Sequence, residues 1–520
     1  MRRSFLFAIL ITLPGLVQAQ KNDYNWLTGY DSYYHNVHDS AVRGYTFGDM
    51  KLDFNDTPVA ITFDSLEMNF DKATTTYSDS EGNILFYTNG IYIANALNLP
   101  IENSDSLNAG YIELVWDPTI FTGGYRTPQG VIGLPSVANS NQYYLLSSFI
   151  DIVPNSNQSE AYYPKMLSAL IDMSANGGLG QVLYKNQPLI TDNLGAAIQC
   201  VKHGNGRDWW ILVQKRNTNC FYWMLLDTAG FHVMPDLTCT GDTIYYDQSD
   251  ASCFSPDGTK FAYLGAISGL NIYDFDRCTG LLSDPRNLPL PSIVDSLWGG
   301  IGVSISPNSR FLYLSLTHQI YQFDLWADNI FSTVDTIGIY NGGHMPNTPQ
   351  VETDFFTQQL GPDGKIYMSC GNAVPYYHVI NNPDEKGTLC NFVQDGVVLP
   401  TLTIGIPNFP NYRLGSLTQS QCDSLTTFTQ DIRDAKEKIL KVFPNPANDY
   451  TTIDYGFTDW NKGPISLEIS DAIGQIIYTQ PLPMYSGFQK LNITHFAAGI
   501  YNVSIKRSGA TIAVAKLVKQ

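Results

Sequence analysis

A short turn followed by an aromatic strand recurs six times in this chain and limits its fold more than any other feature. Proline presets φ at the first corner of such a turn, Asn or Asp bonds its own backbone, and Gly accepts a positive φ. Asp257 and Asp363 are therefore interpreted as turn residues. The six copies are Ser80-Glu81-Gly82-Asn83 before ILFYT, Asn139-Ser140-Asn141 before QYYLLSS, Asn205-Gly206-Arg207 before DWWILVQ, Ser255-Pro256-Asp257-Gly258 before TKFAYLG, Ser306-Pro307-Asn308-Ser309 before RFLYLSL, and Gly361-Pro362-Asp363-Gly364 before KIYMSC.

The spacing of these turns indicates the number of repeats. Five steps separate Gly82 from Gly364, about 56 residues each, so residues 20–415 have room for about seven units. Antiparallel blades in a ring leave only short, protected edges, which suits a long all-β chain. We predict an approximately seven-bladed β-propeller over residues 20–415. Its last blade is expected to be shared between the chain ends, with a strand near Gly48–Phe54 closing on strands from the C-terminal side.

Composition and charge agree with an all-β chain and exclude one class of partner. The 520 residues include 42 Gly, 28 Pro, 32 Tyr and 26 Phe, and long amphipathic stretches are few, so helix should be scarce. The formal charge is −18. Residues 441–520 carry a small positive excess, so the acidity lies in the preceding body, which would repel a phosphate backbone. Nucleic acid is not an expected partner.

The N-terminus predicts export. Met1-Arg2-Arg3 precedes an apolar run from Phe5 to Val17, and the small residues before Gln20 suit cleavage between Ala19 and Gln20. We predict a signal peptide over residues 1–19 and no transmembrane segment, since no later run of apolar residues is long enough. In an oxidising compartment the eight cysteines are expected to pair, but spacing leaves all 105 connectivities open.

The C-terminal part of the chain changes character after Gly415. Residues 416–440 are polar, then charged, and are predicted to form a linker in which DIRDAKEKIL makes about two helical turns. From residue 441 to 520, alternating runs such as ISLEIS and IYNVSIK lie between turn residues. They predict a small Ig-like β-sandwich of about seven strands.

Residues 441–520 contain an opening PNP at 444–446, a central DxxG at 471–474, a late GxY at 499–501 and a basic terminal strand. In that order these motifs resemble the type A C-terminal sorting domain of the type IX secretion system. The resemblance implies recognition by the outer-membrane translocon and removal by a sortase-like peptidase, with delivery through the periplasm to the outer cell surface or medium. The last strand, residues 513–520, is the expected recognition element. The motif residues are Pro444, Asn445, Pro446, Asp471, Gly474, Gly499, Tyr501, Lys516, Leu517, Val518 and Lys519.

The body carries weaker resemblances. SPDGTKFAYL followed by NIYDFD resembles WD40-like and lactonase-type β-propellers of secreted bacterial proteins. SDSEGNILFYTNG, LGPDGKIYMS, HVINNPDEKGTLCNF and IPNFPNYRLG are similar to an uncharacterised group of secreted propellers from Bacteroidetes-type bacteria. Lactonase-type propellers hold a metal in the central channel. That resemblance leaves a structural or channel Ca²⁺ open, and no other cofactor is predicted.

Local catalytic signatures are absent from the chain, which lacks GxSxG, HExxH, Walker and EF-hand motifs. No catalytic or metal-binding residue is therefore assigned. His35, His38 and Asp39 could bind a metal, as could His344 after Gly342-Gly343, but isolated histidines are more often surface or hydrogen-bonded residues. Trp209-Trp210 could form a sugar-stacking face, although strand alternation favours at least one ring in the core.

A dipeptide pattern suggests a modification of the exported chain. Asp followed by Ser or Thr and an apolar residue resembles the O-glycosylation acceptor of Bacteroidetes-type bacteria, while the alternative is that Asp-Ser simply marks turns. The candidate acceptors are Ser40, Ser65, Ser106, Thr228, Thr243, Ser296, Thr336 and Ser424.

These observations favour a secreted or surface propeller that binds a protein or glycan through rim loops or the central channel. The alternative is a metal-dependent hydrolase of lactonase or glycan-cleaving type that uses the channel. Three or four carboxylate or amide groups converging on an ion would favour the enzyme. An apolar or plugged channel would favour the binding protein.

Overall fold

The computed structural model describes most of the chain and shows an all-β architecture. Helix is confined, among the described residues, to three short 3-10 turns, η1 Asn176–Gly178, η2 Ile330–Thr333 and η3 Gly387–Cys390. The expected scarcity of helix is confirmed. The described residues are 20–30, 48–64, 66–110, 124–152, 161–245, 250–265, 267–289, 301–345, 348–418, 420, 422, 439–456, 465–471, 474–482, 486–507 and 510–520.

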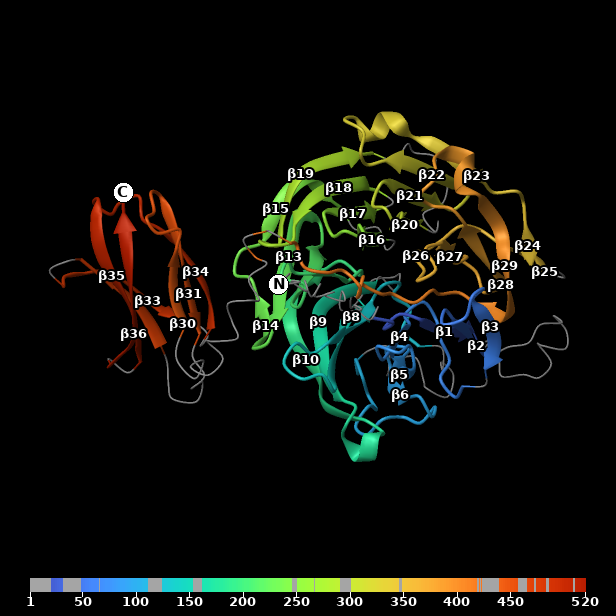
Figure 1. The fold of residues 1–520 in the computed structure, drawn as a ribbon, viewed down its shortest axis with the longest axis horizontal. Coiled ribbons are helices and arrows are strands. Elements are labelled where there is room, and N and C mark those ends of the chain that lie inside the picture. The colour runs from blue at the N-terminus through green and yellow to red at the C-terminus, as the bar shows by residue number, and fades with distance from the viewer. Residues whose placement is uncertain are drawn as a thin grey trace, which may run out of the picture.

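The body forms a ring of antiparallel blades around a centre (Figure 1). Blades 3 and 4 are joined into one sheet by a single β10–β12 pair, Leu194 with Lys215. Blade 1 contains β1 Asn25–Tyr30, β2 Gly48–Asp53 and β3 Ala60–Asp64, and blade 2 contains β4 Thr75–Ser78, β5 Ile84–Thr88 and β6 Ile93–Asn95. Blade 3 contains β7 Val131–Pro135, β8 Gln142–Ile152, β9 Ala161–Asp172 and β10 Gln181–Leu194. Blade 4 contains β11 Gln199–Lys202, β12 Trp209–Lys215, β13 Thr218–Asp227, β14 Gly230–Val233 and β15 Thr238–Ile244.

Blades 5 to 7 each have four strands, and a small hairpin lies between the last two blades in sequence. The approximately seven blades predicted from turn spacing are therefore present in the described chain. Blade 5 contains β16 Asp250–Phe254, β17 Lys260–Gly265, β18 Gly269–Asp276 and β19 Leu281–Leu288, and blade 6 contains β20 Ile301–Ile305, β21 Phe311–Leu316, β22 Gln319–Asp324 and β23 Asp335–Ile339. The hairpin consists of β24 His344–Met345 and β25 Thr348–Glu352. Blade 7 contains β26 Gln358–Leu360, β27 Ile366–Met368, β28 Val374–Ile380 and β29 Phe392–Thr403.

The six repeated turns connect the first and second strands of blades 2 to 7, as the repeat predicts. Gly258 and Gly364 have φ of +73° and +79°, a region that side chains with a Cβ rarely adopt. Asp257 Oδ1 accepts the backbone N–H of Thr259 at 2.9 Å, and Asp363 Oδ1 accepts that of Lys365 at 3.3 Å. Both aspartates are turn residues.

Some middle strands of the blades are buried on both faces, because neighbouring blades cover them. All six residues of β21 are buried, although a half-exposed strand would alternate. Leu264 and Ile272 of blade 5 share one apolar cluster with Leu312 and Leu314 of blade 6. Continuous runs such as FLYLSL therefore reflect packing between blades.

Blade 1 corrects the prediction of a blade shared between the chain ends. β2 pairs with β1 on one edge and β3 on the other, so its partners are all N-terminal. The C-terminal side meets this blade through side chains instead: Thr401 Oγ1 donates to Gly48 O at 3.3 Å, and the Thr28 and Thr403 hydroxyls lie 2.7 Å apart.

The C-terminal residues form two sheets around their own apolar core, the β-sandwich predicted from alternation. Residues 439 and 440 begin β30, so the predicted helix is wrong there. The rest of that segment, residues 431–438, lies outside the described residues. One sheet contains β30 Ile439–Phe443, β31 Tyr450–Gly456 and β34 Ser486–Asn492, and the other contains β33 Ile476–Leu482, β32 Ile465–Ser470, β35 Gly499–Arg507 and β36 Ala510–Lys519.

Candidate functional site

Residues 404–415, here called the channel segment, leave β29 and cross the centre of the ring (Figure 1, orange). Pro407 and Pro410 lack the N–H group that a ladder strand needs, yet residues 405–410 are all buried. The segment runs antiparallel to β1, in the order Gly405 beside Thr28, Phe409 beside Trp26 and Arg413 beside Asp23.

Asn408 joins the channel segment to three blades. Its Nδ2 group lies 3.3 Å from the carbonyl oxygens of Gln129, Val131 and Ile198. Its own backbone N–H donates to Thr74 O at 3.2 Å. Because the side chain is 3% exposed, the three carbonyl oxygens, which share the two N–H groups of the amide, replace the water that it would otherwise bind.

Tyr412 continues this attachment beside blades 2 to 4. Its hydroxyl donates to Gly133 O at 2.6 Å, and its ring lies 5.3 Å from the ring of Tyr77 and 5.8 Å from that of Trp209. Tyr412 is fully buried. The centre of the propeller is therefore filled on this side by the chain's own segment.

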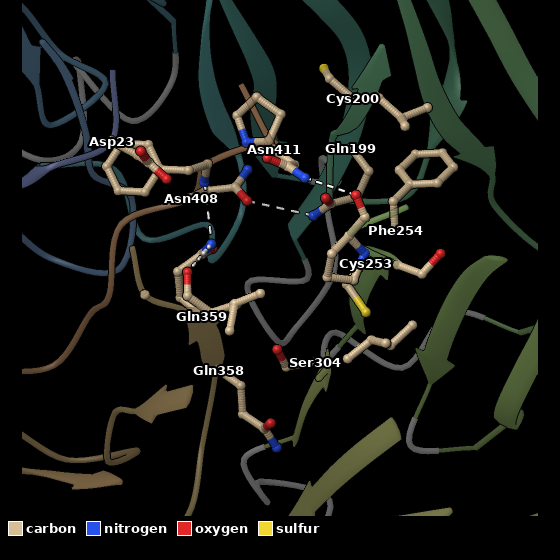
Figure 2. Close-up of a pocket in the computed structure, with 18 of the residues that line it drawn as sticks. Asp23, Gln199, Cys200, Cys253, Phe254, Ser304, Gln358, Gln359, Asn408 and Asn411 are labelled. Atoms are coloured by element: carbon tan, nitrogen blue, oxygen red, sulfur yellow. Dashed lines mark hydrogen bonds between the residues drawn. The ribbon is translucent and has the colours of Figure 1, made fainter. Parts of the chain in front are cut away.

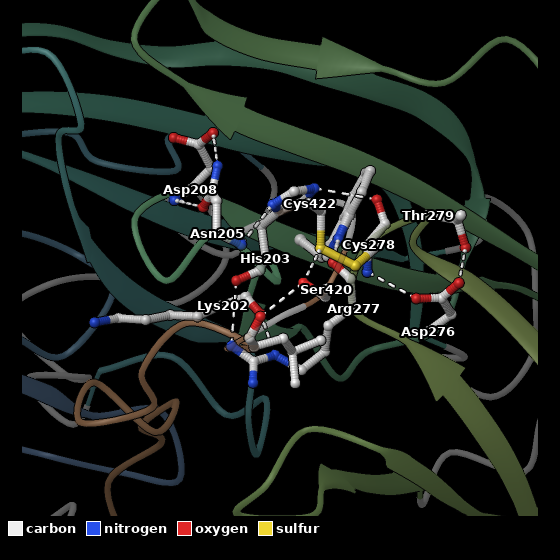
Figure 3. The surroundings of a disulfide bond; sticks show 12 residues. Lys202, His203, Asn205, Asp208, Asp276, Arg277, Cys278, Thr279, Ser420 and Cys422 are labelled. Carbon is white, nitrogen blue, oxygen red and sulfur yellow. Dashed lines mark hydrogen bonds between the residues drawn. A yellow bond between two sulfur atoms is a disulfide. The ribbon is translucent and has the colours of Figure 1, made fainter. Parts of the chain in front are cut away.

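The channel segment leaves the ring between blades 4 and 5, where Arg277 and a disulfide hold it (Figure 3). Arg277 Nη2 donates to Gly415 O at 2.5 Å, and Nε donates to Lys202 O at 2.9 Å. Cys422, which follows the channel segment in the chain, is disulfide-bonded to Cys278. The segment is therefore fixed at both ends.

A half-enclosed cavity of about 280 Å³ remains between the channel segment and blades 4 to 7 (Figure 2). The repeated turns of blades 5, 6 and 7 contribute Pro256, Pro307 and Pro362 to its lining. In the sequence, the pattern of these turns indicates the fold and does not indicate that they line a cavity. The polar lining consists mainly of amides and hydroxyls, namely Gln129, Gln199, Gln358, Gln359, Asn408, Asn411, Ser252 and Ser304.

The acidic and basic side chains of this lining are Asp23 and Arg413, and they pair with each other. Asp23 is 3% exposed, and burial raises the pKa of its carboxyl, an effect that Arg413 opposes. Two thiols, Cys200 and Cys253, also belong to the lining, and burial raises the pKa of both. Besides the Asp23–Arg413 pair, the polar lining therefore consists of amides, hydroxyls and two thiols held in their protonated form.

A buried Cys–His pair lies outside the cavity. Cys370 Sγ lies 3.2 Å from His378 Nε2, but both side chains are almost completely buried. Burial lowers the pKa of His378 to about 4 and raises that of Cys370 well above its usual value. A neutral imidazole beside a protonated thiol packs the core of blade 7.

The residues singled out for chemistry do not converge on the cavity. His35, His38 and Asp39 lie outside the described residues, and His344 is exposed on β24. Trp209 and Trp210 are 1% and 3% exposed, so the sugar-stacking interpretation is wrong and both rings are core. In the described part of the chain, no group of three or more His, Cys, Asp or Glu side chains could hold a metal ion.

The signal that could have revealed the site lies in IPNFPNYRLG. This segment is too apolar to be exposed, and its prolines keep it out of a ladder. Such a segment must be buried by packing against other elements.

The turn that opens the C-terminal sandwich holds its last strand. Asn445 Nδ2 donates to Lys516 O at 2.7 Å, and Asn445 Oδ1 accepts the N–H of Val518 at 2.8 Å. Leu517 is fully buried between them, whereas Lys516 is exposed. The edge strand β36 is thus anchored by one side chain and presents a basic residue outward.

The remaining motif residues build the sandwich. Asp471 Oδ1 accepts the N–H of Gln475 at 2.8 Å in a turn where Gly474 has φ of +86°. Tyr501 is 7% exposed and donates to Ala497 O at 2.7 Å. Residues 441–520 match the family described as the secretion system C-terminal sorting domain. This part of the chain is a type IX sorting domain.

The sorting domain implies export to the cell surface or secretion. No helix among the described residues is long and apolar enough to cross a membrane. Cleavage between Ala19 and Gln20 stays a prediction, since Ala19 lies outside the described chain. Among curated proteins none matches this chain.

Solved structures similar to the chain are remote. A Bacteroides fragilis protein named as a 6-phosphogluconolactonase is 9% identical, with 74% of this chain and 98% of that one covered and a TM-score of 0.36. A Xanthomonas campestris gluconolactonase is 11% identical, with 66% of this chain and 94% of that one covered and a TM-score of 0.25. Chaetomium thermophilum Sqt1, bound to the N-terminus of ribosomal protein L10, is 11% identical, with 87% of this chain and 98% of that one covered and a TM-score of 0.35. At these TM-scores the likenesses carry no argument about activity.

Four of the eight cysteines pair, so the expectation that all would pair is wrong within the described structure. Cys220 and Cys239 join neighbouring strands β13 and β15, and Cys278 joins Cys422. Cys200, Cys253, Cys370 and Cys390 are free.

Half of the candidate glycosylation sites can be placed in the body ahead of the sorting domain. Ser106, Thr228, Thr243 and Thr336 are all exposed. Thr243 lies on β15 and Thr336 on β23, whereas Thr228 lies in the turn between β13 and β14. Ser40, Ser65, Ser296 and Ser424 lie outside the described residues. Glycosylation stays a prediction.

Proposed function

We propose that this protein is an exported recognition protein, which binds a partner in the cavity left beside the channel segment. The observation that carries the proposal is the place of Asn408 at the centre of the ring, where its buried side-chain amide bonds blades 3 and 4 and its backbone N–H bonds blade 2. A propeller whose centre is crossed by its own chain offers a ligand the cavity beside that segment.

The lining favours binding over hydrolysis. Hydrolysis needs a positioned acid and base or a metal-activated water. The carboxylate and guanidinium in the lining, Asp23 and Arg413, neutralise each other, and the other polar groups are amides, hydroxyls and two thiols. Amides and hydroxyls orient a ligand by hydrogen bonds without changing it.

Delivery belongs to the same proposal. The sorting domain brings the propeller to the translocon, and we propose that β36, with exposed Lys516, is the element recognised there. A sortase-like peptidase then removes residues 441–520, so that the propeller acts at the surface or in the medium.

The full chain and a cavity variant test this function. Ser304 is 4% exposed and lines the cavity, so Ser304→Leu should fill space that a ligand needs. Thr336→Leu, on the exposed outer strand β23, is the matched control. Both would be compared with the original chain on a glycan array, on immobilised surface proteins, and in assays with lactones and nitrophenyl glycosides.

The expected result is saturable binding that Ser304→Leu abolishes and Thr336→Leu preserves, with no product formed. Turnover of a lactone or glycoside that Ser304→Leu removes would overturn the proposal in favour of the hydrolase.

A further inference from the structure

We propose that the cavity takes a neutral, hydroxyl-rich ligand, such as the terminal sugar of a glycan. This inference rests on the recognition function and names its ligand class. Three features carry it: the cavity's size and walls, a buried acceptor without a partner, and the absence of net charge among the lining groups.

The size and walls suit one or two sugar rings. A volume of about 280 Å³ lies just below the ~300–1,000 Å³ of pockets for drug-sized ligands. Phe254 and Phe409 provide aromatic surface in the lining, and Pro256, Pro307 and Pro362 provide aliphatic surface. A sugar ring has apolar C–H faces that pack on such side chains while its hydroxyls point elsewhere.

Most amides of the lining are already engaged. Gln129 bonds both the N–H and the C=O of Ser252, each at 2.9 Å. Asn411 Nδ2 donates to Pro256 O at 2.8 Å, and Gln199 Nε2 lies 3.5 Å from Asn408 Oδ1. These side chains hold the channel segment and have little capacity left for a ligand.

Gln358 is the exception. It is 3% exposed, and its Oε1 atom is buried without a hydrogen-bond partner in the described structure. Its Nε2 group lies 3.4 Å from Gly302 O, which orients the amide. A buried carbonyl oxygen without a donor costs about 1–3 kcal/mol. Because this atom has almost no accessible surface, the Gln358 side chain must turn into the cavity before a ligand hydroxyl, which is a donor, satisfies it.

Charge complementarity excludes ionic ligands. The pair formed by Asp23 and Arg413 carries no net charge, so an incoming anion or cation would lose water without gaining a counter-charge. The acidic body further disfavours anions. A neutral polyol meets neither penalty.

The test is calorimetric titration of the full chain with glucose, galactose, mannose, N-acetylglucosamine and maltose, and with glucuronate and glucosamine as charged counterparts. Gln358→Met keeps the side-chain length and removes the whole amide, both the Oε1 acceptor and the Nε2 donor that lies 3.4 Å from Gly302 O. The matched control is Gln322→Met, because Gln322 is equally buried but its Oε1 already accepts the N–H of Gly387 at 2.8 Å.

We expect a neutral sugar to bind, Gln358→Met to weaken it about tenfold, the worth of one hydrogen bond, and Gln322→Met to leave it unchanged. Melting temperatures show that each variant is folded. Preference for a charged sugar, no binding of any sugar, or unchanged affinity in Gln358→Met would each overturn this inference. Loss of sugar binding together with retained, Ser304-dependent capture of a surface protein would leave the recognition function standing.

Discussion

Asp23 and Arg413 lie 390 positions apart and form an ion pair at the centre of the ring, in which the carboxylate is buried. The pair joins the residues before β1 to the channel segment. It links the two ends of the propeller where strand pairing does not.

Replacing Arg413 by Leu should therefore leave Asp23 buried without its counter-charge. We expect the free energy of unfolding to fall by about 1–3 kcal/mol at pH 7, less than for a fully buried pair because Arg413 reaches solvent. Chemical denaturation of the full chain measures this loss. The double variant Asp23→Asn with Arg413→Leu should recover much of it, and an equal loss in both would contradict the ion-pair explanation.

Asp71 should give the propeller a specific pH dependence. Burial raises the pKa of this carboxyl to about 6, against the opposing charge of Arg126 at 3.2 Å. The folded state then holds the proton more tightly than the unfolded chain, so stability from Asp71 is present below about pH 4 and is lost as the pH rises to about 6.

The loss amounts to about 2–3 kcal/mol, and Asp71→Asn should remove it. The measurement is unfolding free energy between pH 4 and pH 7 for both chains. Parallel curves for the two chains would show that Asp71 titrates normally.

The two disulfides should contribute unequally to stability. Cys278 and Cys422 are separated by 144 residues, whereas Cys220 and Cys239 are separated by 19. Chain entropy gives about 5 kcal/mol for the larger loop and about 3 kcal/mol for the smaller. Paired Cys→Ser variants should show the larger drop in melting temperature for the first bond, together with faster proteolysis after Gly415. An equal or reversed order would mean that the larger bond does not restrain the unfolded chain as this model requires.

Passage from the periplasm to the cell surface or medium should depend on the sorting domain. A chain ending at Leu440 should accumulate in the periplasm of a host with the type IX system, and residues 441–520 fused to an unrelated secreted protein should carry it out. Immunoblots of periplasm, surface and medium measure both. Normal surface delivery of the shortened chain would refute the role of these residues.

Glycosylation should appear as added mass. Ser106, Thr228, Thr243 and Thr336 are exposed, so a transferase could reach them. Intact-mass measurement of the secreted chain should show sugar additions that become fewer when these four residues are changed to Ala and disappear when all eight candidate acceptors are changed. A bare polypeptide mass would end the hypothesis.

The turn chemistry predicted the blades well, because it is local. The repeated turns form the first hairpin of blades 2 to 7, and a residue with positive φ closes several of them, as at Gly258, Ser309 and Gly364. Alternation in residues 441–520 likewise predicted the sandwich, since each strand needs only one buried face.

The candidate site could not be predicted in this way. The cavity depends on Asn408 meeting Gln129 and Ile198, on Arg413 meeting Asp23, and on Cys278 meeting Cys422. These contacts join residues far apart in the chain, and their spacing leaves no periodic pattern.

The sequence by itself thus determined the number of blades, the strand-rich core and the exported C-terminal domain, because each follows from backbone preference and local alternation. Only the tertiary structure decided that IPNFPNYRLG crosses the ring, that four thiols stay unpaired and that Gln358 is left without a partner. Those outcomes depend on which surfaces the closed ring brings together, and burial fixes them only once every blade is in place.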